Sequence, residues 1–159
     1  MSTSSEKAPA SLRIAAVAIL TALTTVIGFV RVPLPATQGI FTLADIAIYF
    51  AAFALGPWSA AVAGSLGTAL IDLLGGTAQY APTSLVVHGL QGLLAGLVAG
   101  IAGAGIAGAG TRPGLRGASW VLAGAVGTVV MAGGYLAAET LFYGGFAKAV
   151  TEILFNISH

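Results

Sequence analysis

Residues 41–100 read FTLADIAIYFAAFALGPWSAAVAGSLGTALIDLLGGTAQYAPTSLVVHGLQGLLAGLVAG, and this stretch decides the fold. Nearly all of it is Ala, Val, Ile, Leu, Phe or Gly, in runs typical of membrane-spanning helices. The side chains in these runs that most need an explanation are the carboxyl groups of Asp45 and Asp72, the imidazole of His88 and the amide of Gln91. Burying such groups in hydrocarbon is costly and usually marks a functional site.

The composition of the whole chain indicates an all-α integral membrane protein. Hydrophobic residues make up 57% and charged residues 7% of the chain, and the mean hydropathy is +0.98. Ordinary soluble domains are about 25% charged. The net charge of +1 and the lack of a basic run exclude a nucleic-acid interface. The absence of cysteine excludes disulfides, thiolate metal sites and thiol catalysis.

Apolar runs on either side of this stretch extend the bundle. They predict spans at about 12–31, 41–55, 58–74, 83–106 and 118–142, and an incomplete one at 147–159. We therefore expect a six-helix bundle in the cytoplasmic membrane, with the sixth helix short or truncated in this sequence. Residues 1–11 are predicted to be a disordered cytoplasmic tail, and 12–159 a single transmembrane domain. Segments 31–40 and 111–117 contain prolines and are predicted loops.

The distribution of cations predicts the orientation of the chain. With a cytoplasmic N-terminus, four cationic residues lie inside and two outside: Lys7, Arg13, Arg112 and Arg116 against Arg31 and Lys148. Positive residues concentrate on the cytoplasmic side, so we expect the N-terminus inside. The buried polar residues then gather in the outer half of the bundle, above small apolar residues. This asymmetry predicts a binding cup open to the outside rather than a channel.

Spacing along the helices groups the candidate ligand contacts. His88 and Gln91 are three residues apart and share a helix face with Ser84, and a second face carries Glu152 and Asn156. The residues expected to contact a polar, ring-shaped ligand are Ser84, His88, Gln91, Tyr80, Glu139, Tyr143, Glu152 and Asn156. In the alternative interpretation the polar groups satisfy one another, with Asp72 pairing across a helix end and His88 bonding Glu139.

Small residues repeat at helical spacing in two of the predicted spans. Gly92, Gly96 and Gly100 are four residues apart and predict close contact between helices. Ala18 and Ala22 have the same spacing in the first span, which gives this face a smooth surface for another helix. Ordinary internal packing is the alternative for the two alanines.

Enzymatic motifs find little support in the sequence. Neither lysine follows a glycine, so the chain lacks a phosphate-binding P-loop. The segment 63–67, AGSLG, resembles a nucleophile elbow but has alanine in place of the first glycine. The two histidines are too few for a metal centre. We predict no catalytic residue, no cofactor and no metal.

An ordered set of short motifs resembles a known family. The motifs are Phe41-x-x-x-Asp45, Leu55-Gly56-Pro57, Gly64-x-x-Gly67, Asp72, Pro82-Thr83, and His88-Gly89-Leu90-Gln91-Gly92 with Gly96. In this order they resemble the substrate-binding S component of energy-coupling-factor (ECF) vitamin transporters, in its riboflavin-transporter-like branch. The resemblance implies a six-helix protein with both termini inside that captures a vitamin from outside.

The same resemblance implies partners and a mode of delivery. The partners are a transmembrane T component and two ATPase subunits, with docking through small residues of the first helix, here Ala18 and Ala22. The S component is expected to topple in the membrane to deliver its ligand. We expect a pyrimidine- or pyridine-like B-vitamin precursor, or riboflavin, as the ligand. The alternatives are a non-transporting membrane assembly protein and a proton-coupled carrier that works alone.

Overall fold

The structure is a computed structural model that describes residues 9–33, 40–101 and 113–142. The helices within these ranges are α1 (Ala10–Gly28), α2 (Ala44–Leu55), α3 (Pro57–Leu74), α4 (Ala81–Ile101) and α5 (Pro113–Phe142). A 3₁₀ turn, η1 (Ala78–Tyr80), precedes α4. The predicted sixth span at 147–159, the predicted tail and residues 102–106 of the fourth predicted span lie outside the described residues.

Four of the described helices are long and apolar enough to cross a membrane, namely α1, α3, α4 and α5. Helix α2 is also apolar but has 12 residues. At 1.5 Å per residue it rises about 18 Å, less than the roughly 30 Å of a bilayer core. The chain is therefore a multi-pass, predominantly α-helical membrane protein, as its composition predicts.

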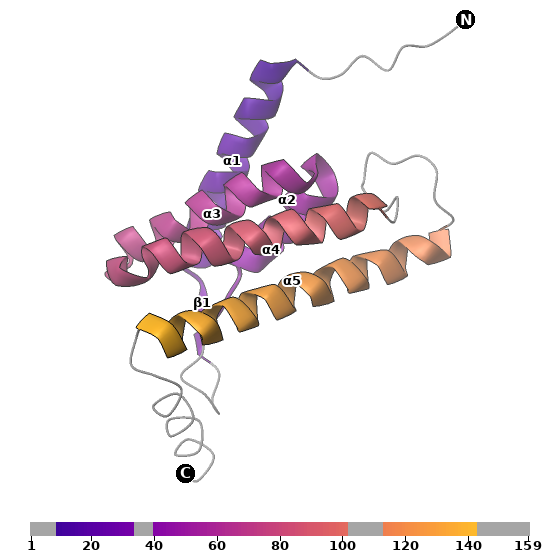
Figure 1. The fold of residues 1–159 in the computed structure, drawn as a ribbon. Helices are drawn as coiled ribbons and strands as arrows, with labels where there is room; N and C mark the ends of the chain where they lie inside the picture. Colours follow the sequence, from indigo (N-terminus) through magenta and orange to yellow (C-terminus); the bar gives the residue numbers. More distant parts are fainter. Residues whose placement is uncertain (1–8, 34–39, 102–112, 143–159) are drawn as a thin grey trace, which may run out of the picture.

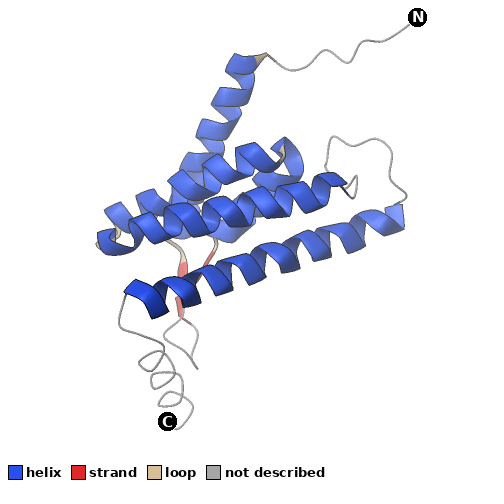
Figure 2. Ribbon diagram, in the orientation of Figure 1, coloured by secondary structure: helices blue, strands red, loops and turns tan. Residues whose placement is uncertain are grey.

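The predicted loop at 31–40 contains a short β-hairpin, which corrects that prediction. Strands β1 (Arg31–Pro33) and β2 (Ile40–Thr42) pair antiparallel, with Val32 opposite Phe41. Figure 2 shows this pair in red beside the blue helices. The β-branched residues in the two strands favour extended backbone. Pro33 is the last residue of β1, a position that suits proline because proline has no N–H to donate to a neighbouring strand. Helix α2 consequently begins at Ala44, three residues later than expected.

The predicted loop at 111–117 is also shorter than expected, because α5 begins at Pro113. Proline suits the first turn of a helix, since its fixed φ is already helical and its missing N–H would have no partner there. Residues 113–117 of the predicted loop therefore belong to the start of a 30-residue helix.

The helices form a layered bundle in which α3 is central. Helix α3 packs against α1, α2 and α4, and α5 packs on the far side of α4 (Figure 1). The α2–α3 turn is made by Gly56 with φ of 87°, a conformation that favours glycine, and Pro57 then opens α3. Helices α3 and α4 run in opposite directions, since Gly96 near the end of α4 meets Pro57 at the start of α3, and Ser84 at the start of α4 bonds Asp72 at the end of α3.

The core of the bundle is built from small side chains. One buried cluster consists of Leu20, Ala51, Ala52, Ala60, Ala63 and Ala95. Interfaces of this kind let helix backbones approach closely, which is how helices associate when lipid removes the hydrophobic driving force.

Among the described residues, two of the three glycines predicted to allow close helix contact on α4 do so. A Cβ atom added at Gly92 would lie 2.6 Å from the carbonyl oxygen of Ala60, and one at Gly96 would lie 2.5 Å from Cα of Pro57. No described atom lies within 4 Å of the same position at Gly100. Helix α3 begins at Pro57, so α4 continues past the end of its partner, and Gly100 makes no such contact there.

Candidate functional site

A chain of hydrogen bonds between polar side chains begins where α3 ends and the chain turns into α4. The hydroxyl of Thr77 donates to Oδ1 of Asp72 over 2.9 Å, and the hydroxyl of Ser84 donates to Oδ2 of the same carboxylate. Asp72 lies in the last turn of α3 and Ser84 in the first turn of α4. The carboxylate therefore joins the two helix ends, as the alternative sequence interpretation expected for Asp72.

Tyr135 of α5 connects Ser84 with His88. Its Oη lies 2.7 Å from Oγ of Ser84 and 3.2 Å from Nε2 of His88. The two rings meet edge to face with their centroids 5.7 Å apart. Ser84 and His88 share a face of α4, as their spacing predicts, and α5 presents Tyr135 to both. The partner seen for His88 on α5 is thus Tyr135, one turn before the predicted Glu139, whose side chain is not described.

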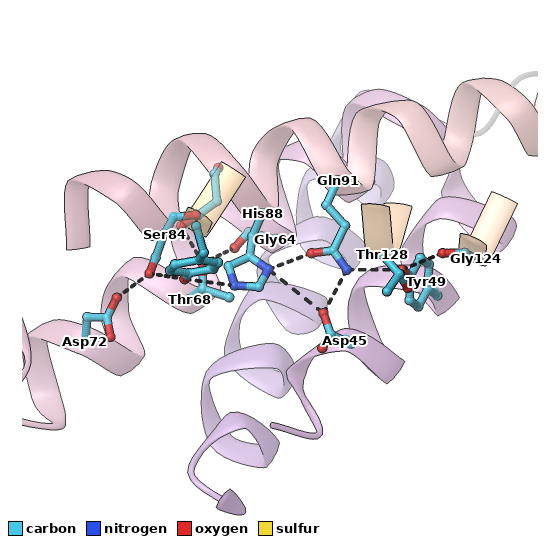
Figure 3. Close-up of polar contacts among 12 residues, drawn as sticks. Asp45, Tyr49, Gly64, Thr68, Asp72, Ser84, His88, Gln91, Gly124 and Thr128 are labelled. Carbon is cyan, nitrogen blue, oxygen red and sulfur yellow. Dashed lines mark hydrogen bonds and ion pairs between the residues drawn. The ribbon is translucent and has the colours of Figure 1, made fainter. Parts of the chain in front are cut away.

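His88, Gln91 and Asp45 form the centre of the site (Figure 3). Nδ1 of His88 lies 2.6 Å from Oε1 of Gln91, and Nε2 of Gln91 donates to Oδ1 of Asp45 over 2.8 Å. Asp45 Oδ1 is also 3.9 Å from Nδ1 of His88. Gln91 is 0% exposed and His88 7% exposed. The amide of Gln91 therefore holds an acidic and a basic side chain in fixed positions.

The position of Asp45 determines which end of the Gln91 amide faces His88. A carboxylate only accepts hydrogen bonds, so the NH₂ group of Gln91 must face Asp45. Its oxygen then faces His88, and because an amide oxygen only accepts, Nδ1 of His88 must carry a proton. The remaining ring nitrogen, Nε2, is the one that faces Tyr135.

Tyr49 extends the chain of hydrogen bonds from the centre to the middle of α5. Nε2 of Gln91 donates to its Oη over 3.2 Å, and that hydroxyl donates to the carbonyl oxygen of Gly124 over 3.0 Å. The hydroxyl of Thr128 is 3.1 Å away and must donate to Tyr49, because the tyrosine proton is already used. Helix α5 is thus joined to the bundle by two tyrosines.

Close contact between α3 and α4 fixes the position of His88 along the axis of the bundle. A Cβ at Gly64 would lie 2.7 Å from the carbonyl oxygen of His88, so only glycine allows this approach. Nearby, the hydroxyl of Thr68 donates to the carbonyl oxygens of Gly64 and Ser84, over 2.8 and 3.3 Å. The Gly64-x-x-Gly67 motif thereby positions the site without touching its side chains.

We call this set the polar chain: Asp72, Ser84, Tyr135, His88, Gln91, Asp45 and Tyr49. Its members come from α2, α3, α4 and α5 and extend from the last turn of α3, at Asp72, to the middle of α4, at Gln91. Among the described residues, no buried side-chain nitrogen or oxygen lacks a hydrogen-bond partner. The described polar groups thus bond one another, and the contact of Ser84, His88 and Gln91 with a ligand stays a prediction.

The predicted ligand contacts divide into three groups. Ser84, His88 and Gln91 belong to the polar chain. Tyr80 lies half-buried in η1, directly before α4, and Glu139 lies on α5 without a described side chain. The other three lie outside the described residues: Tyr143, Glu152 and Asn156.

Sequence reasoning missed the two tyrosines of the polar chain. Both carried a usable signal, since Tyr49 lies four residues after Asp45 and Tyr135 four residues before Glu139. That spacing places each tyrosine on the helix face of an acidic residue. They were missed because a tyrosine in a membrane helix is usually interpreted as an anchor at the membrane–water interface.

Two open grooves lie outside the polar chain. The larger, of about 920 Å³, runs between α1 and α3 and is bordered by Ala18, Ala22 and Trp58, with Arg13 also at its edge. The smaller, of about 460 Å³, lies between α4 and α5 and has an apolar lining that includes Val87 and Gly134. These two lining residues directly precede His88 and Tyr135 in the sequence. No member of the polar chain lines either groove.

The described residues offer little to a metal ion. Across residues 9–33, 40–101 and 113–142, no group of three His, Asp or Glu side chains is placed to hold one. The groups that the polar chain presents are hydroxyls, an amide, an imidazole and carboxylates. These can recognise an organic molecule by hydrogen bonds.

The fold and the site define a multi-pass helical membrane protein with a hydrogen-bonded chain of polar side chains between its helices. A sequence model of the family described as "ECF-type riboflavin transporter, S component" matches residues 10–158. The chain belongs to this family of vitamin-uptake proteins, as the ordered motifs predict.

Two relatives are similar to the chain in sequence. One is "Thiamine precursor transporter HmpT" of Lactococcus lactis subsp. cremoris, 37% identical over 142 residues, which cover 88% of this chain and 74% of the relative. The other is an uncharacterised protein of Pyrococcus woesei, 37% identical over 75 residues, which cover 47% of this chain and 50% of the relative. The family and the first relative are transporter proteins rather than enzymes.

Proposed function

We propose that this chain is the membrane-embedded capture subunit of an ECF-type transporter, and that it binds a small B-vitamin or vitamin precursor from the outside. Membership of the S component family supports the proposal. The observation that carries it is the polar chain, in which four helices bring hydrogen-bonding groups together between apolar helix faces. Ionisable groups inside a membrane protein are costly and are kept mainly for function.

A neutral nitrogen heterocycle suits the chemistry of this site best. The thiamine precursor named for one relative supports a pyrimidine-like ligand. Such a ring presents nitrogen acceptors and amino donors, which complement the hydroxyls of Ser84 and Tyr135 and the imidazole of His88. Riboflavin is the second candidate, because the family is described by it.

Ligand binding at the polar chain requires an exchange of hydrogen bonds. Tyr135 is half-buried, whereas His88 is almost fully buried behind it, so the Tyr135–His88 contact is the one that we expect a ligand to open. Gln91 is fully enclosed, and its role in our proposal is to hold His88 and Asp45 in place. Tyr80, Glu139 and the three residues outside the described part of the chain complete the proposed set of contacts.

The proposal includes partners and a direction of delivery. Ala18 and Ala22 are exposed and border the α1–α3 groove, which makes this groove the proposed docking surface for a T component that works with two ATPase subunits. With a cytoplasmic N-terminus, the polar chain faces outside and the inner halves of the helices are apolar. We propose that the subunit delivers its ligand by toppling.

Purification of the full chain in lipid nanodiscs tests capture directly. Small molecules that co-purify are identified by mass spectrometry, and affinities are measured by calorimetry with thiamine, its aminopyrimidine half, its thiazole half and riboflavin. We expect one ligand per chain and a clear preference for the aminopyrimidine. Replacement of His88 by Ala should weaken binding at least tenfold.

The same experiment separates capture from the competing assignments. A protein that binds none of these compounds, and whose His88→Ala variant only loses thermal stability, contradicts capture and supports a structural role for the polar chain. Uptake of ligand into vesicles without any ATPase partner contradicts the ECF assignment and supports a lone carrier.

A further inference from the structure

The α1–α3 groove combines an apolar wall with positive charge at one end. Its lining is mostly Ala, Val, Leu and Ile, but Arg13 borders it on α1 and Trp58 on α3. Both side chains are exposed, Trp58 by 73%. The function proposed above uses the small residues of this groove and gives no role to Arg13 or Trp58.

Helices α1 and α3 run parallel and pack closely in their second halves. A Cβ atom at Gly67 would lie 2.7 Å from Cβ of Thr24, and the hydroxyl of Thr25 donates to the carbonyl oxygen of Gly67 over 3.2 Å. One turn further along both helices, a Cβ at Gly28 would meet the side chain of Ile71. Because the contacts advance in the same direction on both helices, their first residues lie at the same end of the bundle.

Toward these first residues the two helices diverge, and the groove opens between them. Residues 10–15 of α1 are all exposed, whereas Thr24 is buried, and in Figure 1 the first turns of α1 stand away from the bundle. Arg13 and Trp58 lie about 17 and 14 Å before the Thr24–Gly67 contact, at 1.5 Å per residue. They therefore border the open end of the groove together.

The charge at this end is positive and is not neutralised by a described neighbour. The carboxylates among the described side chains are those of Asp45 and Asp72, and both form hydrogen bonds within the polar chain. Neither α1 nor α3 has an acidic residue in its first turn or a side chain that caps its N-terminus. The positive ends of two helix dipoles therefore add to the charge of Arg13.

The groove has about the length of one membrane leaflet. From Trp58 to Leu70 the lining of α3 covers about 18 Å, at 1.5 Å per residue. One leaflet contributes about 15 Å to a hydrocarbon core of roughly 30 Å. Tryptophan favours the membrane–water interface, and arginine extends its charge to the lipid head groups while its stem stays on apolar surface. The arrangement therefore matches a phospholipid, with the head group beside Arg13 and an acyl chain along the groove.

We propose that this groove holds one phospholipid with an anionic head group, drawn from the leaflet on the side of the N-terminus. Arg13 and the two helix starts select the negative head group, and the apolar wall holds an acyl chain. A zwitterionic lipid fits the same wall but gains less at the positive end, because its own cation opposes Arg13. Selection by head-group charge is thus what distinguishes this site from general contact with lipid.

The site has a consequence that rests on the proposed function. Ala18 and Ala22 border the same groove, so a T component that docks there must displace the lipid. The groove of the free subunit is then covered, and an exchange of lipid for partner accompanies assembly.

Native mass spectrometry of the full chain measures the bound lipid. The protein is released from nanodiscs that contain equal amounts of phosphatidylglycerol and phosphatidylcholine. We expect one retained phosphatidylglycerol per chain and a preference over phosphatidylcholine of about fivefold, the typical contribution of one cation near an anionic membrane surface. Retention of no lipid, or of both lipids equally, overturns the proposal.

Variants separate the positive end from the apolar wall. Arg13→Gln should abolish the preference, and Arg13→Lys should keep it. Arg31→Gln is the matched control, because it removes an arginine that follows the opposite end of α1. Ala22→Leu should release the lipid whichever head group it carries, whereas Ala15→Leu, outside the groove lining, should not. A preference that survives in Arg13→Gln, or that Arg31→Gln abolishes equally, overturns the proposal.

Trp58 reports on the groove independently. The chain has two tryptophans, so Trp120→Phe leaves Trp58 as the single fluorophore of this kind. Phosphatidylglycerol with brominated acyl chains should quench its fluorescence at a lower mole fraction than brominated phosphatidylcholine does. Addition of Arg13→Gln should make the two lipids equal. Equal quenching by the two lipids before that addition overturns the proposal.

The displacement by a partner is measured apart from the site. In nanodiscs rich in phosphatidylglycerol the chain should recruit less T component than in phosphatidylcholine, and Arg13→Gln should remove that difference. Equal recruitment by the parent contradicts docking at this groove, while the lipid measurements on the free subunit stand. Absence of vitamin binding would contradict the proposed function alone, since none of the lipid measurements needs a vitamin.

Discussion

The side-chain amide of Gln91 donates a hydrogen bond of 2.8 Å to Asp45, a residue 46 positions earlier in the chain. This bond joins α4 to the first turn of α2, and the other end of the same amide holds His88. Gln91 is fully buried. One neutral side chain thus fixes the relative positions of an acidic and a basic group inside a membrane protein.

Removal of the Gln91 amide should destabilise the fold. Gln91→Ala removes the hydrogen bonds that Gln91 makes with Asp45 and with Nδ1 of His88, and a buried unsatisfied polar group costs about 1–3 kcal/mol. We expect a loss of at least about 2 kcal/mol, measured by unfolding in detergent micelles. Gln91→Met fills the space without hydrogen bonds and should recover only the packing part of the loss. A Gln91→Met protein as stable as the parent would show that these bonds contribute nothing.

The glycines of α4 provide a matched pair of substitutions. Gly92→Ala places a methyl group against the backbone of Ala60 and should destabilise the protein by about 1–3 kcal/mol, a typical cost of overpacking. Gly100→Ala meets no described atom and should stabilise the helix by up to about 1 kcal/mol, the difference in helix propensity. Thermal unfolding of the two variants measures both effects. Equal effects would contradict the described register of α3 and α4.

Substitutions in the α1–α3 groove should separate docking from folding. Ala18→Leu and Ala22→Leu fill an exposed groove, so we expect little change in thermal stability and a strong loss of co-purification with the T component and ATPase subunits. Ala15→Leu is the control, because Ala15 is exposed on α1 but does not line the groove. If Ala15→Leu impairs co-purification to the same extent, the groove is not the docking surface.

The lack of cysteine makes the orientation of the chain directly testable. We introduce single cysteines as Ala78→Cys, in the exposed turn before α4, and as Ser4→Cys, in the N-terminal tail. A membrane-impermeant maleimide should label Ala78→Cys on intact cells and Ser4→Cys only after permeabilisation. The reverse pattern would place the polar chain on the cytoplasmic side and contradict capture from outside.

Local sequence patterns predicted much of the fold. The apolar runs predicted the described helices, and the ordered motifs predicted the family. The predictions were less accurate at the ends of elements, where the β-hairpin and the first turn of α5 replaced expected loops. Prolines in these segments indicate a break between helices, but they carry no information on whether a strand, a loop or a new helix follows.

Spacing along one helix also predicted part of the site. It grouped Ser84, His88 and Gln91 on one face of α4, since residues three and four apart are neighbours on a helix. It could not show that Tyr135 bonds Ser84 and His88, or that Asp45 bonds Gln91. Those pairs lie on different helices, and their meeting depends on how each helix is rotated and raised against the next.

By itself, the sequence determined that this chain is a membrane protein, roughly where its described helices run and that Ser84, His88 and Gln91 share a helix face, because hydropathy and helical spacing are local properties. Only the tertiary structure decided that the polar groups of four helices form one hydrogen-bonded chain. The physical reason lies in backbone contacts such as that of Gly64 with His88, which set the height of one helix against another. These contacts arise between residues distant in sequence and leave no periodic signal in it.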